Sequence, residues 1–417
     1  MNLQLNYDQP MTMHIDLNSC FAIIEQQANP LIRNKPVAVA AYDTPKGAVL
    51  AASYEAKALG IKLMLNVREA RRLCPDLIVM MPDPDKYFDA HKRFKEVLLN
   101  YTDEVTPKSI DEFVVNFAGS RAMQKGMSLE EVGYQIKADI KESLGEYVTV
   151  NIGIATNRFL AKVASSLNKP DGLDFVSADN IRDVYAQLEL DDLPGINSRF
   201  RARLNMAGIY TPIQFLDAPV WKLKKEVFHG ILGFYWYLRL RGYEIDSVDF
   251  GRKSFGQQYA LGHKTRDPQE LYRLLMKLCE KTGRRLRRSG YIGSGVHLHM
   301  TFENRTFWSH GKKLKKRIYS TQDIFLAAQN LLNSAPIPAR VTNISVTVYG
   351  LQPSTPEQLG LFDDTRIDTR SLAKAADIVN DRYGEFTVVP AIMANMQEVI
   401  LKRIAFGNVK EIYPSTG

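Results

Sequence analysis

Cysteine is scarce in this sequence, and its three occurrences, Cys20, Cys74 and Cys279, lie far apart. A disulfide framework or a zinc site needs paired or clustered cysteines, so neither organises this chain. Long apolar runs are missing as well, because no stretch approaches the roughly 20 residues that a membrane-spanning helix requires. The first residues also lack the basic and apolar segments of a signal peptide. We therefore expect a cytosolic protein that does not use a membrane.

The composition is not that of a disordered chain, because 45% of the residues are hydrophobic and 10% are aromatic. A chain of 417 residues can form about three domains with their own cores. The formal net charge of +8 is unevenly spread: residues 252–317 contain 17 lysines and arginines but four acids, a local net charge of +13. Such a basic region is typical of a module that binds a polyanion.

The stretch Ser109-Ile110-Asp111-Glu112 lies between two runs rich in β-formers, residues 104–106 and 113–117, and this pattern predicts a hairpin. At the bend both carboxylates can turn toward one site, where each raises the pKa of the other unless a cation lies between them. Mg²⁺ suits that place, since it binds carboxylate oxygens together with substrate phosphates. An isolated Asp-Glu pair is more often a solvated turn, so this interpretation needs a second observation.

Asp16 supplies that observation, because it ends a strand-like run over residues 11–16. Three carboxylates on two neighbouring strands are what a two-metal phosphoryl-transfer site requires. One metal ion activates the attacking 3′ oxygen, and the other holds the triphosphate and the leaving pyrophosphate.

Three motifs carry a family resemblance: Asp16-Leu17-Asn18-Ser19-Cys20-Phe21-Ala22, Tyr54-Glu55-Ala56-Lys57 and Ser109-Ile110-Asp111-Glu112. In order and spacing they resemble the catalytic motifs of the Y-family (translesion) DNA polymerases, and the resemblance covers roughly residues 11–362. Within that family, the bacterial polymerase IV and polymerase V catalytic-subunit branches are the most similar. The resemblance implies a DNA-directed DNA polymerase that copies damaged templates with low fidelity.

The resemblance also implies an α+β fold in the form of a right-hand polymerase. Its expected parts are a ferredoxin-like palm (residues 1–30 and 81–178), small fingers (31–80), a helical thumb with a helix-hairpin-helix (179–245), a βαββαβ little finger domain (246–351), a linker (352–365) and a C-terminal extension (366–417). Residues 1–10 are polar and expected to be loose. In the extension we expect a helix over residues 371–382 and a strand over residues 385–389.

The resemblance assigns catalysis to Asp16, Asp111 and Glu112. Asp16 and Asp111 would ligate two Mg²⁺ ions, for which Mn²⁺ can substitute, and the Leu17 carbonyl would help. Glu112 would complete the coordination of the ion that holds the attacking oxygen.

Four residues are implied at the incoming deoxynucleoside triphosphate. Phe21 is the steric gate, whose ring takes the place of a ribose 2′-hydroxyl, although an ordinary core Phe fits the same pattern. Tyr54 and Lys57 lie one helical turn apart and would contact the triphosphate, and Arg158 would contact it from the palm.

The sequence departs from the common family pattern at three positions. Lys57 stands where Arg is commoner, which replaces a planar fork by a point charge. Asn18 stands where many relatives have a further Asp, and Cys20 where Phe or Tyr is usual. None of these changes removes a metal ligand. Lys162 and Lys169 fit surface charges and triphosphate contacts equally well, and both interpretations stay open.

Two regions predict contacts to primer-template DNA. The thumb segment resembles a helix-hairpin-helix in which Gly195, Ile196 and Arg199 meet a phosphate, although a plain helical packing unit has the same pattern. In the basic region we expect Lys253, Arg305 and Lys313 to contact template phosphates. His297 and His299 share a strand face there, but without a third ligand they predict packing or DNA contact and not a metal site.

A short motif after a Pro-flanked linker contains Gln358, Leu359, Leu361 and Phe362. It resembles the peptide by which bacterial polymerases bind the sliding clamp, and its position at the end of a polymerase body gives it weight. We expect a monomeric protein whose partners are DNA, deoxynucleoside triphosphates and this clamp.

Two other functions fit parts of the pattern. A catalytically weak or inactive adaptor of a damage-bypass complex would bind DNA and the clamp, but such relatives usually lose the carboxylates that are present here. A nucleotidyl cyclase shares a palm with paired carboxylates, but it needs neither the helix-hairpin-helix nor the basic region.

Overall fold

The computed structural model describes residues 3–247, 251–354, 369–396 and 399–400. These residues form two compact units, one before and one after residues 248–250. Within the described ranges, no helix combines the length and the apolar character needed to cross a lipid bilayer.

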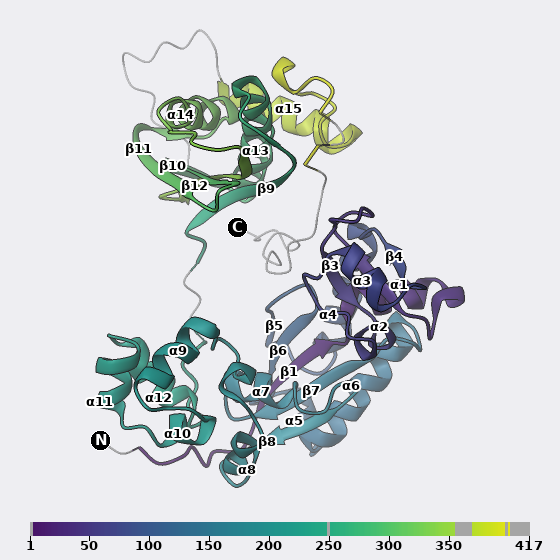
Figure 1. Cartoon of the computed structure of the whole chain (residues 1–417). Coiled ribbons are helices and arrows are strands. Elements are labelled where there is room, and N and C mark those ends of the chain that lie inside the picture. Colours follow the sequence, from purple (N-terminus) through teal and green to yellow (C-terminus); the bar gives the residue numbers. More distant parts are fainter. Residues whose placement is uncertain (1–2, 248–250, 355–368, 397–398, 401–417) are drawn as a thin grey trace. The chain divides into compact units, whose positions relative to one another are not determined.

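A five-stranded sheet organises the first unit, with the strand order β5-β6-β1-β7-β8 (Figure 1). Its strands are β1 (Thr12–Leu17), β5 (Val105–Pro107), β6 (Glu112–Asn116), β7 (Val150–Ala155) and β8 (Leu173–Val176). β1 pairs antiparallel with both β6 and β7. The chain runs through β1, β5, β6 and β7 as strand, helix, hairpin, helix and strand, so the predicted ferredoxin-like plan is confirmed. β8 extends it, parallel to β7.

Alternating side chains give this sheet two different faces. On the face of Phe113, α4 (Pro84–Leu99) packs through Phe94, whose ring meets Phe113 edge-on, and α6 (Leu129–Leu144) lies against β7 and β8. On the opposite face, α7 (Arg158–Ala164) packs so closely that a Cβ on Gly153 would come within 2.1 Å of the Ala161 carbonyl oxygen. Since Gly153 pairs with His14, the side chains of His14 and Asp16 share the face that α7 covers.

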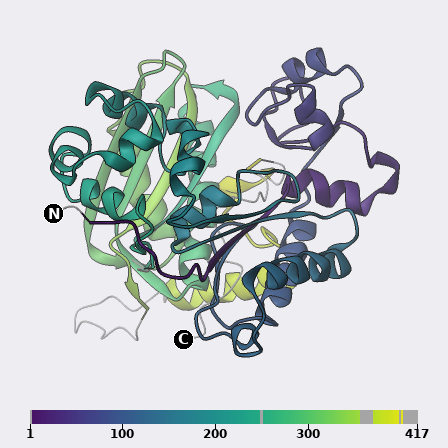
Figure 2. The same cartoon turned by 90° about the horizontal axis from the view of Figure 1, so that it is seen from below.

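A smaller sheet forms its own lobe in the first unit, drawn in dark blue and purple in Figure 1 and Figure 2. Its strand order is β3-β2-β4, with β2 (Val37–Ala40), β3 (Val49–Ala52) and β4 (Ile78–Met80). Three helices accompany it: α1 (Cys20–Ala28), α2 (Tyr54–Ala58) and α3 (Val67–Leu73). α2 ends just before Gly60, whose φ of +84° suits glycine. β4 is short and half-buried.

Short helices complete the first unit, and they include the segment predicted as a helix-hairpin-helix. They are α5 (Arg121–Gln124), α8 (Ile181–Ala186), α9 (Ser198–Met206), α10 (Pro212–Asp217), α11 (Val220–Lys222), a π-helical turn (Leu223–Val227) and α12 (Leu232–Arg239). The core beneath the last of these helices is aromatic, because the rings of Phe215, Phe228 and Trp236 pack against one another.

The prediction that residues 1–10 are loose is wrong for the described part, residues 3–10. The Leu3 N–H donates to the Tyr237 hydroxyl at 3.0 Å, and the Asn6 N–H donates to the Arg241 carbonyl at 2.8 Å. Leu3 and Leu5 also pack against the helical core. Two apolar side chains in a polar stretch were enough to anchor it, and the segment ties the helices to β1.

The second unit is built on four long strands in the order β11-β10-β12-β9. The strands are β9 (Ser254–Thr265), β10 (Tyr291–Phe302), β11 (Phe307–Ile318) and β12 (Val341–Tyr349), and β13 (Gln352–Pro353) pairs with β10. α13 (Pro268–Arg288) and α14 (Thr321–Asn333) pack on one face over a core that includes Leu275, Leu298 and Val346. The predicted βαββαβ order is confirmed.

The described part of the C-terminal extension packs on α13. α15 (Thr369–Tyr383) confirms the predicted helix, and its Asp377 carboxylate accepts two hydrogen bonds from the Arg287 guanidinium at 2.6 and 2.8 Å. The predicted strand over residues 385–389 is wrong, because turns and bends occupy those residues. The Asn380 side chain bonds the N–H and the carbonyl of Val388, which a strand would have paired with a neighbour.

Candidate active site

The three candidate carboxylates converge at one end of the large sheet. Asp16 and Glu112 are direct partners on the antiparallel strands β1 and β6. Asp111 immediately precedes β6, and its carbonyl accepts a hydrogen bond from the Leu17 N–H at 2.9 Å. Two strands that are far apart in sequence therefore place their acidic residues at the same end of the sheet. The expected convergence is confirmed, while the catalytic roles stay predictions.

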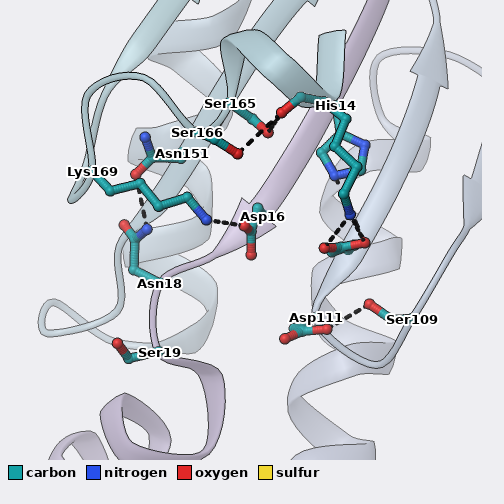
Figure 3. A network of polar contacts seen from close by, with 12 residues as sticks. His14, Asp16, Asn18, Ser19, Ser109, Asp111, Asn151, Ser165, Ser166 and Lys169 are labelled. Atoms are coloured by element: carbon teal, nitrogen blue, oxygen red, sulfur yellow. Dashed lines mark hydrogen bonds and ion pairs between the residues drawn. The ribbon is translucent and has the colours of Figure 1, made fainter. Parts of the chain in front are cut away.

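Two lysine ammonium groups lie on these carboxylates. Lys162 on α7 donates to both oxygens of Glu112, at 2.6 and 2.7 Å, and Lys169 bonds the Asp16 carboxylate (Figure 3). Sequence reasoning left both lysines undecided between surface charges and site residues. The structure brings both into the site. A signal was present, because α7 follows β7 directly and must cross one face of the sheet, which aims one side of the helix at the strand ends.

Burial dominates the electrostatics of the acids. It raises the pKa of Asp111 to about 6; the neighbouring charges of Asp16 and Glu112 add to the rise, and a hydrogen bond from Ser109 opposes it. Burial also raises the pKa of Asp16, although the Lys169 ammonium works against this. Carboxylates with raised pKa values are short of positive charge. The site therefore favours additional cations beyond the two lysines.

His14 lies beside this cluster and was not singled out from the sequence. It is 2% exposed, its Nε2 is 3.8 Å from a Glu112 oxygen, and neither ring nitrogen has a hydrogen-bond partner among the described residues. Burial holds the pKa of His14 well below its usual value, and the charges of Lys162 and Lys169 add to that effect. His14 therefore lies against Glu112 as a buried ring whose charged form is disfavoured by its surroundings.

The smaller lobe contributes Tyr54 and Lys57 to the same site. The Lys57 ammonium donates to the Ser19 hydroxyl at 2.6 Å and lies 4.5 Å from the centre of the Tyr54 ring. Burial raises the pKa of Tyr54 to about 12, the charge of Asp16 adds to the rise, and hydrogen bonds with Ser19 and Asn18 oppose it. Burial lowers the pKa of Lys57. The structure therefore places both predicted triphosphate contacts next to Asp16.

Phe21 lies at the start of α1 and is 1% exposed. Its ring stacks on Tyr87 of α4, with ring centres 4.3 Å apart, and the Tyr87 hydroxyl donates to Glu25 at 2.7 Å. Phe21, in the segment that follows Asp16, is therefore a packed core residue. This arrangement fits the open alternative that one ring serves both packing and sugar selection.

Arg158 is held away from the carboxylate cluster. Its backbone N–H donates to Glu244 at 3.0 Å, and its guanidinium donates to the Asp246 carbonyl at 3.2 Å. Arg239 holds the Asp246 carboxylate with two hydrogen bonds, at 2.8 and 2.5 Å. The N-terminus of α7 thus grips the segment that leads out of the first unit. Of the four predicted nucleotide contacts, Arg158 is the one that the structure does not bring to the acids.

The predicted DNA contacts are exposed except for Ile196, which is 5% exposed. Gly195 has a φ of +92°, which forms the expected bend before α9, but the Ile196 N–H donates to the Leu193 carbonyl and the Arg199 N–H donates to Asn197. In the second unit Lys253, Arg305 and Lys313 are exposed. His297 bonds the Ser309 hydroxyl at 2.8 Å and His299 stacks on Phe307, which fits the packing interpretation of these histidines. The clamp motif at Gln358, Leu359, Leu361 and Phe362 falls outside the described residues.

The residues present fit a divalent cation by their chemistry. Carboxylate oxygens are the ligands that Mg²⁺ prefers, and here they are partly buried and drawn to ammonium groups that stand in for a metal ion. Among the described residues, no group of three His, Cys, Asp or Glu side chains is already arranged to hold a metal ion. The lysines would have to turn aside first.

Comparisons with known proteins agree with this geometry. Residues 15–166 match the impB/mucB/samB family, and residues 252–361 match the impB/mucB/samB family C-terminal domain. DNA polymerase IV of Moorella thermoacetica is 33% identical over 384 residues, which cover 90% of this chain and 94% of that protein. DNA polymerase IV of Pelotomaculum thermopropionicum is 31% identical over 394 residues, which cover 93% of this chain and 96% of that protein.

Solved structures give the same result. The Y-family DNA polymerase chimera Dbh-Dpo4(243-245)-Dbh superposes with a TM-score of 0.71 at 26% identity, covering 82% of this chain and 98% of its own. The insertion ternary complex of Dbh DNA polymerase superposes with a TM-score of 0.56 at 26% identity, covering 81% and 98%. These matches exclude the nucleotidyl cyclase alternative. The sheet that carries Asp16, the basic second unit and the likeness to polymerase IV along most of the chain lead to one conclusion: the chain belongs to the Y family of DNA polymerases.

Proposed function

We propose that this enzyme performs low-fidelity translesion synthesis, extending a primer on damaged template DNA by two-metal nucleotidyl transfer. The observation that carries the proposal is the convergence of Asp16, Asp111 and Glu112 beside two lysines. The family uses divalent metal ions. We propose that Asp16 and Asp111, with the Leu17 carbonyl, hold both ions, and that Glu112 completes the one at the primer terminus. When bound, the ions supply activation of the 3′ oxygen and neutralisation of the leaving pyrophosphate.

The two lysines act as place-holders in this scheme. Each ammonium sits at the end of a flexible four-carbon stem, so it can leave its carboxylate at small cost when a divalent ion binds. Lys169, released from Asp16, then becomes free to bind the triphosphate. Lys162 stays near Glu112 and the primer end. While no substrate is bound, the lysines supply positive charge to Glu112 and Asp16.

The incoming nucleotide is held from two sides. Tyr54 and Lys57 bind the triphosphate from the smaller lobe, and Lys169 binds it from the large sheet. Arg158 joins them only after it exchanges Glu244 for a phosphate. Phe21, at the base of this pocket, excludes a ribose 2′-hydroxyl.

The domain roles follow from the same assignment. The large sheet is the palm, the smaller lobe is the fingers, α8 to α12 form the thumb, and β9 to β12 with α13 and α14 form the little finger domain. The fingers contain α2 and α3, helices of five and seven residues, and so short a lobe leaves the nascent base pair loosely enclosed. That looseness supports a tolerance for damaged templates.

Contacts to partners are part of the proposal. In the thumb, the Ile196 and Arg199 N–H groups are engaged within the loop, so Gly195 and the Arg199 guanidinium bind the phosphate. Lys253, Arg305 and Lys313 bind template phosphates. Gln358, Leu359, Leu361 and Phe362 dock to a bacterial sliding clamp, and the enzyme acts as a monomer on DNA.

Primer extension tests the assignment directly. Asp111→Ala or Glu112→Ala should abolish extension on undamaged and lesion-bearing templates, because each change removes a ligand of the reacting ions, while DNA affinity stays within about twofold. The measurement is single-turnover incorporation with Mg²⁺, with and without a clamp, alongside DNA binding. Retained extension by both variants would refute the assignment. Wild-type protein that binds DNA but extends no primer would favour the adaptor alternative.

Phe21→Ala should let the enzyme incorporate ribonucleotides, because it removes the ring that we place against the 2′-hydroxyl. Since Phe21 is also buried on Tyr87, the variant should lose stability, on the order of 3 kcal/mol. Phe21→Leu serves as the milder control, and the ratio of deoxyribonucleotide to ribonucleotide incorporation is the measurement. A ratio that stays the same in both variants places the gate elsewhere.

A further inference from the structure

Asn18 is a buried amide whose polar atoms are all engaged. It is 1% exposed and lies just after β1, where its Oδ1 accepts hydrogen bonds from the Thr149 hydroxyl at 2.9 Å and the Asp171 N–H at 3.0 Å. Its Nδ2 donates to the Asn151 Oδ1 at 2.8 Å. An amide offers two acceptor lone pairs and two donor hydrogens, so these three contacts use both acceptor sites and one of the donors.

These contacts reach the loop that carries Lys169. Asn151, which Asn18 contacts (Figure 3), extends the connection, because its Nδ2 donates to the Asn168 carbonyl at 3.0 Å. The loop is therefore held on both sides of Lys169, at Asn168 through Asn151 and at Asp171 through Asn18. Between these two anchors, the Lys169 ammonium bonds the Asp16 carboxylate.

The outer side of the loop is fixed by a different element. The Lys137 ammonium on α6 donates to the carbonyls of Asp171 and Gly172, the latter at 3.3 Å, and Lys141 donates to the Asp171 carboxylate at 3.1 Å. These contacts hold the loop against the sheet, but they approach from the side away from Asp16. The inner contacts through Asn18 and Asn151 are the ones that determine where the Lys169 backbone lies relative to the acids.

We infer that Asn18 is a positioning residue, which acts through the Asn151 bridge and the Asp171 N–H to place the Lys169 ammonium first on Asp16 and then on the incoming triphosphate. The inference rests on the proposed polymerase function. It also accounts for an amide at a position where the resemblance led us to expect an acid. An aspartate could accept from Thr149 and Asp171, but it could not donate to Asn151, and it would add a negative charge close to Asp16.

Steady-state primer extension with varied deoxynucleoside triphosphate tests the inference. Asn18→Asp and Asn18→Ala should raise KM for the nucleotide by about tenfold or more, the loss expected for one or two buried hydrogen bonds, and should reduce kcat less. Affinity for primer-template DNA should not change. Asn180→Asp is the matched control, because Asn180 also accepts from a backbone N–H and donates to a backbone carbonyl, yet lies at the start of α8. It should leave KM unchanged.

Two further variants keep the test decisive. Asn151→Asp removes the donor to the Asn168 carbonyl and should raise KM in the same way, even if the Asn18 variants fold poorly. In the double variant Asn18→Ala with Lys169→Ala, KM should match that of Lys169→Ala alone, because residues that act through one another are not additive. Fully additive effects, or an unchanged KM in Asn18→Asp and Asn151→Asp, would overturn the inference.

The wild-type protein in the same assay separates this inference from the proposed function. Absence of extension by the wild type would refute the polymerase assignment. Normal extension by the wild type, with unchanged KM in the variants, would refute only the role of Asn18.

Discussion

The sheet that carries Asp16 and the sheet of the second unit share the order of their elements, but they differ in how their strands are arranged. In the first unit, the first strand in the chain, β1, is central and has β6 and β7 as neighbours. In the second unit, the corresponding strand, β9, lies at an edge. The last residue of the central strand β1 is surrounded by neighbouring strands, whereas the side chains of an edge strand are more exposed to solvent.

The charges follow this difference. Asp16, Glu112 and Asp111 are packed together at the end of two central strands, and burial shifts the pKa of Asp16 and Asp111. The lysines of the edge strand β11 are exposed and spread along the strand. Buried opposite charges interact strongly, so the loss of one charge there has a large effect. Exposed like charges produce a diffuse electrostatic field, so the loss of one of them has a small effect. The two sheets should therefore respond very differently to single substitutions.

The largest difference in nucleotide incorporation is expected between two variants that each neutralise one acidic residue. Asp16→Asn should reduce single-nucleotide incorporation by at least about 1000-fold, because it removes a ligand of the reacting metal ions. Glu303→Gln, at the turn after β10, should change incorporation by less than about twofold, since Glu303 is exposed and pairs with Arg340. Comparable losses in both variants would break the comparison.

The next effect is a dependence of stability on pH in the absence of divalent ions. Because the pKa of Asp111 is raised to about 6, the folded state holds the Asp111 proton more tightly than the unfolded state does. The stability that this provides is fully present below about pH 4 and is lost as the pH rises through 6, a change of about 3 kcal/mol. Asp111→Asn should remove this dependence. Urea denaturation at pH 4 and pH 8 is the measurement.

The prediction also concerns the stability of Asp111→Asn relative to the wild type at each pH. Asp111→Asn should be more stable than the wild type at pH 8 and close to it at pH 4, although it should not extend a primer. Equal pH dependence in the two proteins would show that Asp111 does not carry a desolvation penalty. Addition of Mg²⁺ should stabilise the wild type more than the variant.

The smallest effect is expected on the second sheet. Lys313→Ala should weaken DNA binding a few-fold at low salt and reduce the slope of log affinity against log salt by about one, because it removes one phosphate contact. Lys125→Ala, an exposed lysine of the first unit, is the control and should change neither quantity. The measurement is fluorescence anisotropy with primer-template DNA at several salt concentrations. An unchanged slope would exclude Lys313 from the DNA contacts.

Local patterns in the sequence predicted the hairpin of β5 and β6 and the strand that ends at Asp16, because alternating runs and turn residues act over a few positions. The capping box of Ser128 and Glu131 at the start of α6 is another local pattern of this kind. The strand order was not accessible for the second unit, because the same βαββαβ pattern in sequence is compatible with different pairings. Pairing depends on contacts between residues that are far apart in the chain, and for the first unit the family resemblance supplied it.

The sequence predicted those site residues whose role follows from their own chemistry. It missed those whose role depends on a contact that exists only in the folded chain. Asp16, Asp111 and Glu112 were predicted because strand patterns placed them together and because they match the motifs of the family resemblance. The position of Lys162 on the helix after β7 was a signal, but only the folded chain shows which carboxylate Lys162 and Lys169 each contact. Arg158 was assigned to the nucleotide without regard to Glu244, which lies 86 positions further along the chain.

The helix after the clamp motif has a practical meaning for anyone who shortens this protein. α15 covers Arg284 and Arg287 of α13, whose side chains are 5% and 4% exposed, and it supplies their carboxylate partners Asp377 and Asp381. A truncation before residue 369 would expose both guanidinium groups and remove the acids that neutralise them. Activity lost in such a protein would therefore report damage to the second unit, and it could not be attributed to loss of the proposed clamp contact.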